Sequence, residues 1–333
     1  MKKVAAVLTL FCTNLAFAAP DISGPVASVY DRVIVHNANN SVQVCNNFKV
    51  KLNETKDGAA AEALDTVFKQ LLLAWKKVEA TYMAGELDHD YLDTPRFIDV
   101  FHNSNEDLSA IMQRQLASSS PPAKALFKNS FKTVNALEAV LYADTQLSAR
   151  ELSFAAVMAD SICGHLQDIA TVYTDQRHAL LADPEKALAL YTHALSNSIF
   201  TGKEWRIADP AGLSRKYKDQ PNAKRSEYAL SGHSLAAIEA VFEVHQAMMG
   251  QQDYANLADV IKMYQANELA EAINLTLEQI MQQIGQLGQQ AFAFQPDLTR
   301  PLYDSAGQLY QHYYVSLLSA LPIVGKILEA DGD

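Results

Sequence analysis

The glutamate at position 138 is the residue of this sequence that most needs a chemical explanation. Glu138 lies in the apolar run of residues 132–144. At about 100° per residue, a helical wheel places Phe127 and Phe131 on either side of it. A carboxylate that faces a protein core costs on the order of several kcal/mol unless a partner compensates its charge. The sequence therefore predicts a core-facing carboxylate whose partner has still to be found.

A second glutamate, Glu79, repeats this arrangement in the helix predicted for residues 58–83. By angle it falls between Phe68 and Leu72, on the apolar face of that helix. Helical bundles bind metals with carboxylates from facing helices, so Glu79 and Glu138 together predict a metal site. The alternatives are that the two carboxylates share a proton, that they bind a cationic ligand, or that each meets a structural arginine, a backbone donor or a solvated helix end.

Asn135 lies one helical turn before Glu138, at the edge of the same face. A histidine at this position would complete a His-x-x-Glu metal pair. Asparagine is a poor ligand for transition metals, although it is adequate for calcium. We expect the Asn135 amide to form a hydrogen bond with its neighbour Glu138.

Two serines, Ser231 and Ser234, lie one turn apart in the helix predicted for residues 226–250, on the face that also carries His245. His245 is about three turns from Ser234, roughly 16 Å by helical rise. That distance excludes a serine–histidine nucleophile pair within this helix. We expect both serines to allow close helix packing, and the alternative is that they donate hydrogen bonds to a ligand.

The first 18 residues predict export of the chain. Lys2 and Lys3 precede an apolar run of residues 4–15, and residues 16–18, Ala-Phe-Ala, have the form of a signal-peptide cleavage site. No later stretch is both long and apolar enough to predict a membrane span. We therefore expect a signal peptide over residues 1–18 and a mature chain in the periplasm, with attachment to the outer membrane as an open alternative.

Export would leave two cysteines, Cys45 and Cys163, in an oxidising compartment. A disulfide between them is one interpretation, and two isolated buried thiols is the other. The sequence does not decide between them, because a disulfide requires close Cα atoms that spacing alone does not reveal. The absence of a Cys-x-x-Cys pair excludes a structural zinc site of that type.

The charge of the chain limits its partners. The formal net charge is −11, and loss of Lys2 and Lys3 with the signal peptide would take it to −13. Such a charge disfavours nucleic acid and anionic membrane surfaces as partners.

The periodicity predicts an all-α fold, with apolar residues at helical spacing almost throughout. The helices are expected at 24–55, 58–83, 104–118, 121–143, 148–182, 184–208, 226–250, 254–288 and 297–321. We interpret them as two bundles of the four-helix type, over residues 19–182 and 183–333. The similarity of residues 136–142 to residues 237–243 suggests an old duplication, and chance similarity between alanine-rich helices is the alternative.

The chain resembles the imelysin-like family in several short motifs that occur in the family's order. These are VEATYM (78–83), TVNALEAVLY (133–142), SGHSLAAI (231–238) and the ADGD ending. The resemblance implies two helical bundles with a site in the cleft between them, and an exported, often iron-regulated role. Relatives include proposed peptidases, a ferrous-uptake component and polysaccharide binders. By position, the residues that would line the cleft are Glu79, Asn135, Glu138, Ser231 and Ser234, with Arg225 as a neighbour.

The chain departs from the family pattern at its central motif. Thr133 stands where the family has glycine, and Asn135 stands where it has the histidine. The change removes the best metal ligand and the obvious general base. We therefore predict no catalytic residue, and expect non-catalytic binding linked to iron uptake.

In this interpretation the six cleft residues contact the ligand, and iron or another divalent metal, if bound, contacts Glu79 and Glu138. The ligand class stays open between a small molecule, a metal, a peptide and a glycan. One alternative is a peptidase that depends on Glu138. The other is an interaction or polysaccharide-binding scaffold, in which both core glutamates are dispensable.

Overall fold

The computed structural model of the chain describes residues 19–288 and 294–323. The signal peptide predicted for residues 1–18 and the ADGD ending lie outside these ranges. Within them helices are by far the main secondary structure, which confirms the all-α prediction. The one sheet of the described residues is a pair of two-residue antiparallel strands, β1 (Ala59–Ala60) and β2 (Gln146–Leu147). No helix in the described part of the chain has the length and apolar character that a membrane span requires.

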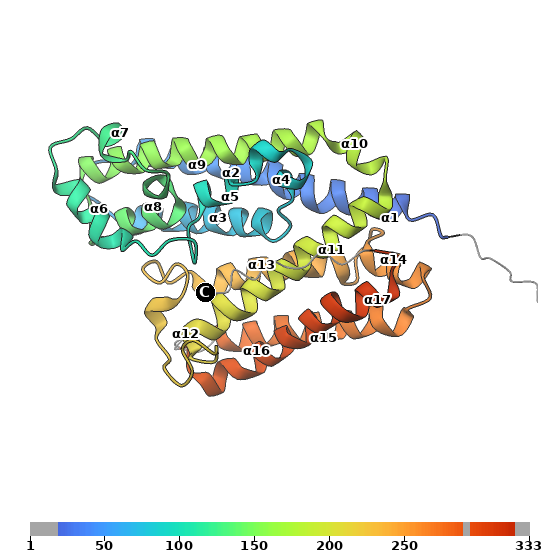
Figure 1. Cartoon of the computed structure of the whole chain (residues 1–333). Coiled ribbons are helices and arrows are strands. Elements are labelled where there is room, and N and C mark those ends of the chain that lie inside the picture. The colour runs from blue at the N-terminus through green and yellow to red at the C-terminus, as the bar shows by residue number, and fades with distance from the viewer. Residues whose placement is uncertain (1–18, 289–293, 324–333) are drawn as a thin grey trace, which may run out of the picture.

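The N-terminal part of the chain forms the upper group of helices in Figure 1. Its long members pack on one another: α2 packs against both α3 and α9, and the shorter α8 packs against α9. A short helix and one π-helical segment lead into α2 without a break. The bounds are α1 (Ser23–Val29), η1 (Tyr30–Val35), α2 (His36–Glu54), α3 (Glu62–Glu79), α8 (Val134–Leu141) and α9 (Ala149–Asp175).

Short helical segments connect α3 to α8, and several of them pack against α9. They are α4 (Ala84–Leu87), η2 (His89–Tyr91), α5 (Thr94–Ile98), α6 (Leu108–Ala117), α7 (Pro122–Ala125) and η3 (Asn129–Lys132). The single helix predicted for residues 121–143 is therefore wrong. The chain becomes extended at Thr133, whose hydroxyl accepts a hydrogen bond from the N–H of Ala136 (3.4 Å) and caps a new helix, α8. Because of this break Phe127 is 68% exposed instead of lying beside Glu138.

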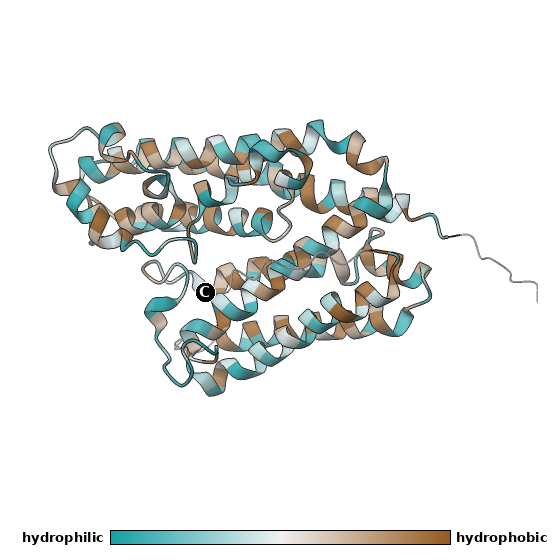
Figure 2. Cartoon of the chain, in the orientation of Figure 1, coloured by the Kyte–Doolittle hydropathy of each residue, from teal (hydrophilic) through white to brown (hydrophobic). Residues whose placement is uncertain are grey.

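The C-terminal part forms the lower group in Figure 1, in which α13 and α16 both pack against α15. The short helix α10 (Arg177–Leu181) follows α9 in the upper group. The elements of the lower group are α11 (Pro184–Thr201), η4 (Gly202–Ala208), α12 (Asp209–Ala211), η5 (Ala223–Arg225), α13 (Ser234–Met249), α14 (Leu257–Met263), α15 (Asn267–Gly288), α16 (Pro296–Gln311), η6 (His312–Leu317) and α17 (Leu318–Ala320). Figure 2 shows hydrophobic and hydrophilic residues alternating along these helices, as expected where each helix buries one face.

The two groups meet where α13 packs on α3. The two groups also contact each other through α1, which packs on α11 and α14. The packing therefore does not by itself divide the chain at residue 182, and the two-bundle boundary and the duplication stay predictions.

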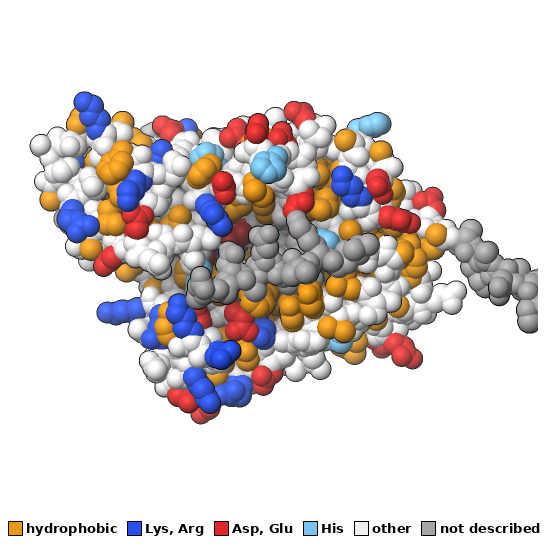
Figure 3. All heavy atoms as spheres, in the orientation of Figure 1, with side chains coloured by type: hydrophobic (Ala, Val, Ile, Leu, Met, Phe, Trp, Pro, Cys, Tyr) orange, Lys and Arg blue, Asp and Glu red, His pale blue; other side chains and the backbone are white. Residues whose placement is uncertain are grey.

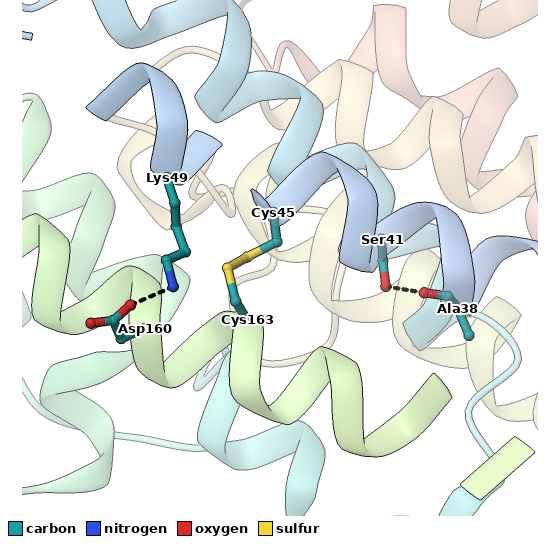
Figure 4. Close-up of a disulfide and its surroundings, with 6 residues drawn as sticks. All are labelled: Ala38, Ser41, Cys45, Lys49, Asp160 and Cys163. Carbon is teal, nitrogen blue, oxygen red and sulfur yellow. Dashed lines mark hydrogen bonds and ion pairs between the residues drawn. A yellow bond between two sulfur atoms is a disulfide. The ribbon is translucent and has the colours of Figure 1, made fainter. Parts of the chain in front are cut away.

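A disulfide joins Cys45 on α2 to Cys163 on α9, with the two Cα atoms 5.6 Å apart (Figure 4). An ion pair between Lys49 and Asp160 (2.6 Å) spans the same two helices. Of the two interpretations left open by the sequence, the disulfide is correct. It links segments that are 118 residues apart in the sequence.

Candidate functional site

A buried lysine occupies the centre of the contact between the two groups of helices. Lys76 lies on α3 and is completely buried. Its Nζ donates to the carboxylates of Glu79 (2.8 Å), Asp99 (2.7 Å) and Glu227 (2.5 Å). Burial alone would lower the pKa of Lys76, but the neighbouring carboxylates, Asp99 foremost, raise it above its ordinary value. The lysine is therefore charged at any physiological pH.

Arg206 on η4 supplies the second cation. Its Nε donates to Glu227 Oε2 (2.7 Å), and its Nη2 donates to Glu79 Oε2 (2.8 Å). We call Lys76, Glu79, Asp99, Arg206 and Glu227 the junction ion cluster. Three members come from the N-terminal part of the chain and two from the C-terminal part, so the cluster ties the two groups of helices together electrostatically.

Asp99 is the most completely bonded carboxylate of the cluster. Besides Lys76, its Oδ2 accepts from Trp75 Nε1 (3.1 Å) and from the Tyr228 hydroxyl (2.7 Å), and its Oδ1 accepts from the N–H of Phe101 (2.9 Å). Burial would raise the pKa of Asp99, but Lys76 and these donors hold it well below its ordinary value. Asp99 is therefore ionised throughout the physiological range.

Glu79 is compensated by cations of the chain itself. Its carboxylate contacts Lys76 and Arg206, and its side chain is 27% exposed. This is the structural alternative that the sequence had left open for Glu79. Both cations contact its Oε2, so this oxygen would reach a metal or ligand only if one of these ion pairs breaks.

Glu138 differs from the cluster carboxylates because no cation compensates it. It is only 6% exposed, and its Oε1 accepts from the backbone N–H (2.9 Å) and hydroxyl (2.7 Å) of Ser231. Among the described residues, no Lys, Arg or His side chain forms an ion pair with it. Burial raises the pKa of Glu138 from 4.5 to about 7. The hydrogen bonds from Ser231 lower the pKa and offset this effect only in part, whereas the negative charges of Glu227 and Asp99 raise the pKa further.

Ser231 reaches Glu138 from a turn and not from the predicted helix. The helix expected from residue 226 begins at Ser234, and residues 226–233 form what we call the Ser231 turn. Two residues of this turn, Tyr228 (φ 55°) and Gly232 (φ 74°), have left-handed backbone conformations. An apolar pattern at helical spacing does not reveal such a turn, which is why the helix prediction started too early.

The other predicted residues, Ser234, Asn135 and Arg225, form hydrogen bonds with groups other than Glu138. Ser234 donates its hydroxyl to the carbonyl of Glu227, inside the cluster region. Asn135 does not bond Glu138 as expected, and its Oδ1 accepts from the N–H of Val100 (2.7 Å). Arg225 turns into its own loop: its guanidinium stacks on Tyr217 at 4.0 Å, and its Nη1 donates to the carbonyl of Gln220 (2.5 Å).

The structure thus brings Glu138 and Ser231 together directly and makes Glu79 a member of the junction ion cluster. Ser234 bonds the backbone of the cluster residue Glu227, and Asn135 bonds the residue after Asp99. The structure does not bring Arg225 to them. Sequence reasoning missed Lys76, Asp99, Arg206 and Glu227. The one local signal was a lysine three residues before an inward glutamate, and its other partners come from distant segments.

Basic side chains gather at the lower left end of the molecule in Figure 3. The loop between α12 and α13 carries five of them: Arg215, Lys216, Lys218, Lys224 and Arg225. Arg225 belongs to this surface and not to the buried junction.

His245 contacts a serine of another helix, Ser198 on α11, and not Ser231 or Ser234. It is completely buried, and its Nε2 lies 3.1 Å from the Ser198 hydroxyl while its Nδ1 lies 3.4 Å from that of Tyr313. Burial lowers the pKa of His245 to about 3, so the ring is neutral. It serves the core of the C-terminal group and contacts neither predicted serine.

The donor set at the junction does not suit a resident metal. Glu79 is held by two cations, which leaves Glu138 as a single carboxylate with serine hydroxyls nearby. In residues 19–288 and 294–323, no three His, Cys, Asp or Glu side chains are grouped so that they could hold an ion. One carboxylate can contact a cation that is carried and released, but it does not form the multi-ligand set of a structural or catalytic metal site.

Two cavities of the described chain lie away from the predicted residues. The larger, about 370 Å³, is at the end of α13 between α14 and α15, with Gln251, Asn256, Glu271 and Asn274 among its lining residues. The smaller, about 160 Å³, lies between α2 and α9. Neither is lined by a predicted site residue, so the inter-bundle cleft stays a prediction.

We expect Glu138→Gln to change how stability depends on pH. A carboxyl group whose folded pKa is raised from 4.5 to about 7 gives its full stability below pH 4.5 and loses it as the pH rises through 7. The loss amounts to about 3 kcal/mol, and glutamine does not titrate. Part of this loss has already occurred at pH 5, so relative to the parent the variant should gain about 2.5 kcal/mol in free energy of unfolding when the pH is raised from 5 to 8. Urea unfolding at both pH values measures this, and a constant difference would contradict it.

Together the geometry defines an all-helical protein whose buried ion cluster leaves one glutamate uncompensated at the contact between two helix groups. The family model for Imelysin matches residues 34–311. The chain therefore belongs to the imelysin family, which confirms the resemblance seen in the sequence.

Solved structures agree in fold. An imelysin-like protein from Psychrobacter arcticum 273-4 matches with a TM-score of 0.74 and 18% identity, covering 90% of this chain and 96% of its own. A putative iron-regulated protein A precursor from Parabacteroides distasonis ATCC 8503 matches with a TM-score of 0.63 and 13% identity, covering 90% of this chain and 95% of its own. A comparison with curated proteins gives no significant match.

Proposed function

We propose that this imelysin-family protein binds a cationic ligand at Glu138 without transforming it, in an exported role linked to iron uptake. The observation that carries the proposal is the missing counter-charge of Glu138. Each of the other three carboxylates at the junction contacts Lys76, Arg206 or both. A cation brought by a ligand would supply what the chain does not, and perturbed buried carboxyl groups of this kind are typical of functional sites.

Export and iron enter the proposal from separate observations. The signal-peptide pattern of residues 1–18 supports a periplasmic location, and the Cys45–Cys163 disulfide suits an oxidising compartment. The link to iron rests on the name of the Parabacteroides distasonis neighbour. In this proposal iron is cargo that is held loosely, and the domains 19–182 and 183–333 are two bundles that meet at the binding site.

Ferrous ion is the first probe for this proposal. We expect isothermal titration calorimetry under anaerobic conditions to show one ion bound per chain at pH 8. Binding should weaken about tenfold at pH 6, because protonation of a carboxylate with a pKa of about 7 removes its charge. Glu138→Gln should abolish this pH dependence and weaken binding at pH 8 by a similar factor.

Glu239→Gln is the matched control. Glu239 occupies the position in the sequence echo that corresponds to Glu138, but it is partly exposed on α13. Its replacement should leave ferrous binding unchanged. Binding that is equal in the parent and Glu138→Gln would show that Glu138 does not hold the cation.

A peptidase is the second candidate, and one observation favours it. A carboxylate with a pKa of about 7 is well matched to general-base catalysis at neutral pH. A peptidase of this kind also needs a bound metal or an activated nucleophile, and Asn135 cannot replace the family's histidine in either role. Hydrolysis of an unfolded protein that disappears in Glu138→Gln would establish the peptidase and overturn non-catalytic binding.

A further inference from the structure

We propose that Tyr228 and Asn135 are positioning residues that hold Ser231 against Glu138 through a closed ring of contacts beginning and ending on α8. The inference rests on the proposed function only in taking Glu138 as the site carboxylate. Neither positioning residue needs to touch the ligand. Each of the two residues would act on the site through the two hydrogen bonds that Ser231 donates to Glu138.

The ring begins at the position where the family has its histidine. Asn135 Oδ1 accepts from the N–H of Val100, which fixes the segment that follows α5 against α8. The residue before Val100 is Asp99, whose Oδ2 accepts from the Tyr228 hydroxyl (2.7 Å). Because Asp99 also accepts from Lys76 and Trp75, its carboxylate is fixed in place and gives Tyr228 a rigid partner.

The backbone of Tyr228 connects this ring of contacts to the Ser231 turn. A left-handed φ of 55° in a residue other than glycine is unfavourable, so the surroundings must hold it. The buried side chain provides that hold through its hydroxyl and through Lys76 Nζ, which lies 5.3 Å from the ring centroid. The carbonyl of Tyr228 then accepts from the N–H of Gly232 (3.1 Å), and the Ser231 hydroxyl oxygen, whose one proton is donated to Glu138, lies 3.3 Å from the same carbonyl.

The far end of the turn is fixed independently. His233 Nε2 lies 2.9 Å from Asp65 Oδ1 on α3, and the same oxygen accepts from the Tyr142 hydroxyl (2.5 Å). Both ends of the turn are thus anchored to the N-terminal group of helices, and Ser231 lies between them. The ring closes where Ser231 donates to Glu138, one helical turn after Asn135 on α8.

The pKa of Glu138 in the ligand-free protein is the measurement that tests this ring. Carbon-13 NMR of labelled glutamate carboxyl groups gives it, and Glu138→Gln identifies the signal. The negative charges of Glu227 and Asp99 also raise the pKa of Glu138, and none of the variants used replaces either residue. Ser231→Ala should raise the pKa of Glu138 by roughly one unit, because it removes a hydrogen bond to a charged group.

Tyr228→Phe is the decisive variant. It keeps the aromatic side chain and the local charges, but it removes the hydroxyl that donates a hydrogen bond to Asp99. We expect it to raise the pKa of Glu138 by several tenths of a unit in the parent and by clearly less in Ser231→Ala, since residues that act through each other are not additive. Tyr313→Phe, which changes another buried tyrosine, is the matched control and should leave Glu138 unchanged.

An unchanged Glu138 pKa in Tyr228→Phe would overturn the proposal. So would equal effects of Tyr228→Phe in the parent and in Ser231→Ala, because Tyr228 would then act on Glu138 without Ser231. If Tyr228→Phe does not fold, Asn135→Ala breaks the ring at its other side and decides in the same way. Because no ligand is present, the result is independent of whether ferrous ion binds.

Discussion

Replacing Lys76 with methionine is expected to lower the free energy of unfolding by about 3–5 kcal/mol, the usual cost of removing one partner from a buried ion pair. The variant leaves Asp99, Glu227 and Glu79 with Arg206 as the remaining cation of the cluster. Arg206 contacts Glu79 and Glu227 but forms no ion pair with Asp99 in the described structure. Urea unfolding at pH 7 measures the loss, and failure of the variant to fold would agree with it.

The next residue provides a matched control for this substitution. Lys77 pairs with Glu243 on α13 at 2.6 Å, but the two side chains are 33% and 44% exposed. Partly exposed ion pairs contribute about 0–1 kcal/mol. Lys77→Met should therefore change stability by less than about 1 kcal/mol. Similar losses in the two variants would contradict the role given to the junction ion cluster.

Removal of the Cys45–Cys163 disulfide is expected to have the second large effect. The bond closes a loop of 118 residues, and chain-entropy estimates for loops of this length give about 4–5 kcal/mol. The double variant Cys45→Ala/Cys163→Ala should therefore unfold at a clearly lower urea concentration than the oxidised parent.

The reduced parent separates the bond from the side-chain change. Dithiothreitol treatment should lower its stability toward that of the double variant, and should leave the variant itself unaffected. The Lys49–Asp160 ion pair across the same helices cannot replace the disulfide, because it is exposed. A loss below about 1 kcal/mol in both comparisons would contradict this prediction.

The sequence was informative about residues that local periodicity controls. Glu138 was predicted to face the core and is buried, although Phe127 and Phe131, which the helical wheel placed on either side of it, lie outside its helix α8. The all-α fold followed from the same signal along the whole chain. Ser231 was selected from its place on the apolar face of a predicted helix and again through the family resemblance, and it donates hydrogen bonds to Glu138.

Long-range pairing could not be predicted in this way. Lys76 and Glu227 are 151 residues apart in the sequence, and Glu79 and Arg206 are 127 apart. A helical wheel shows that Glu79 points inward, but it says nothing about a guanidinium that arrives from η4. The sequence therefore predicted a single metal site from two glutamates, Glu79 and Glu138, that lie in different environments.

Backbone geometry explains the other differences. The helix predicted from residue 226 overlooked Tyr228, whose left-handed conformation is maintained by Asp99 and Lys76 rather than by a local glycine. Asn135 was expected to serve Glu138 directly, whereas it binds the backbone of Val100. For both residues a contact with a distant segment determines the local structure, and the local sequence pattern does not show that contact.

The proposed role of Glu138 depends most directly on the pKa of its side chain in the folded, ligand-free protein. A carbon-13 titration of the glutamate carboxyl groups, with Glu138→Gln for assignment, measures it. We expect a midpoint of about 7, because burial and the nearby charges of Glu227 and Asp99 outweigh the hydrogen bonds from Ser231. A midpoint at or below the ordinary value of 4.5 would mean that Glu138 is already compensated within the chain, and the basis for a cationic ligand would be gone.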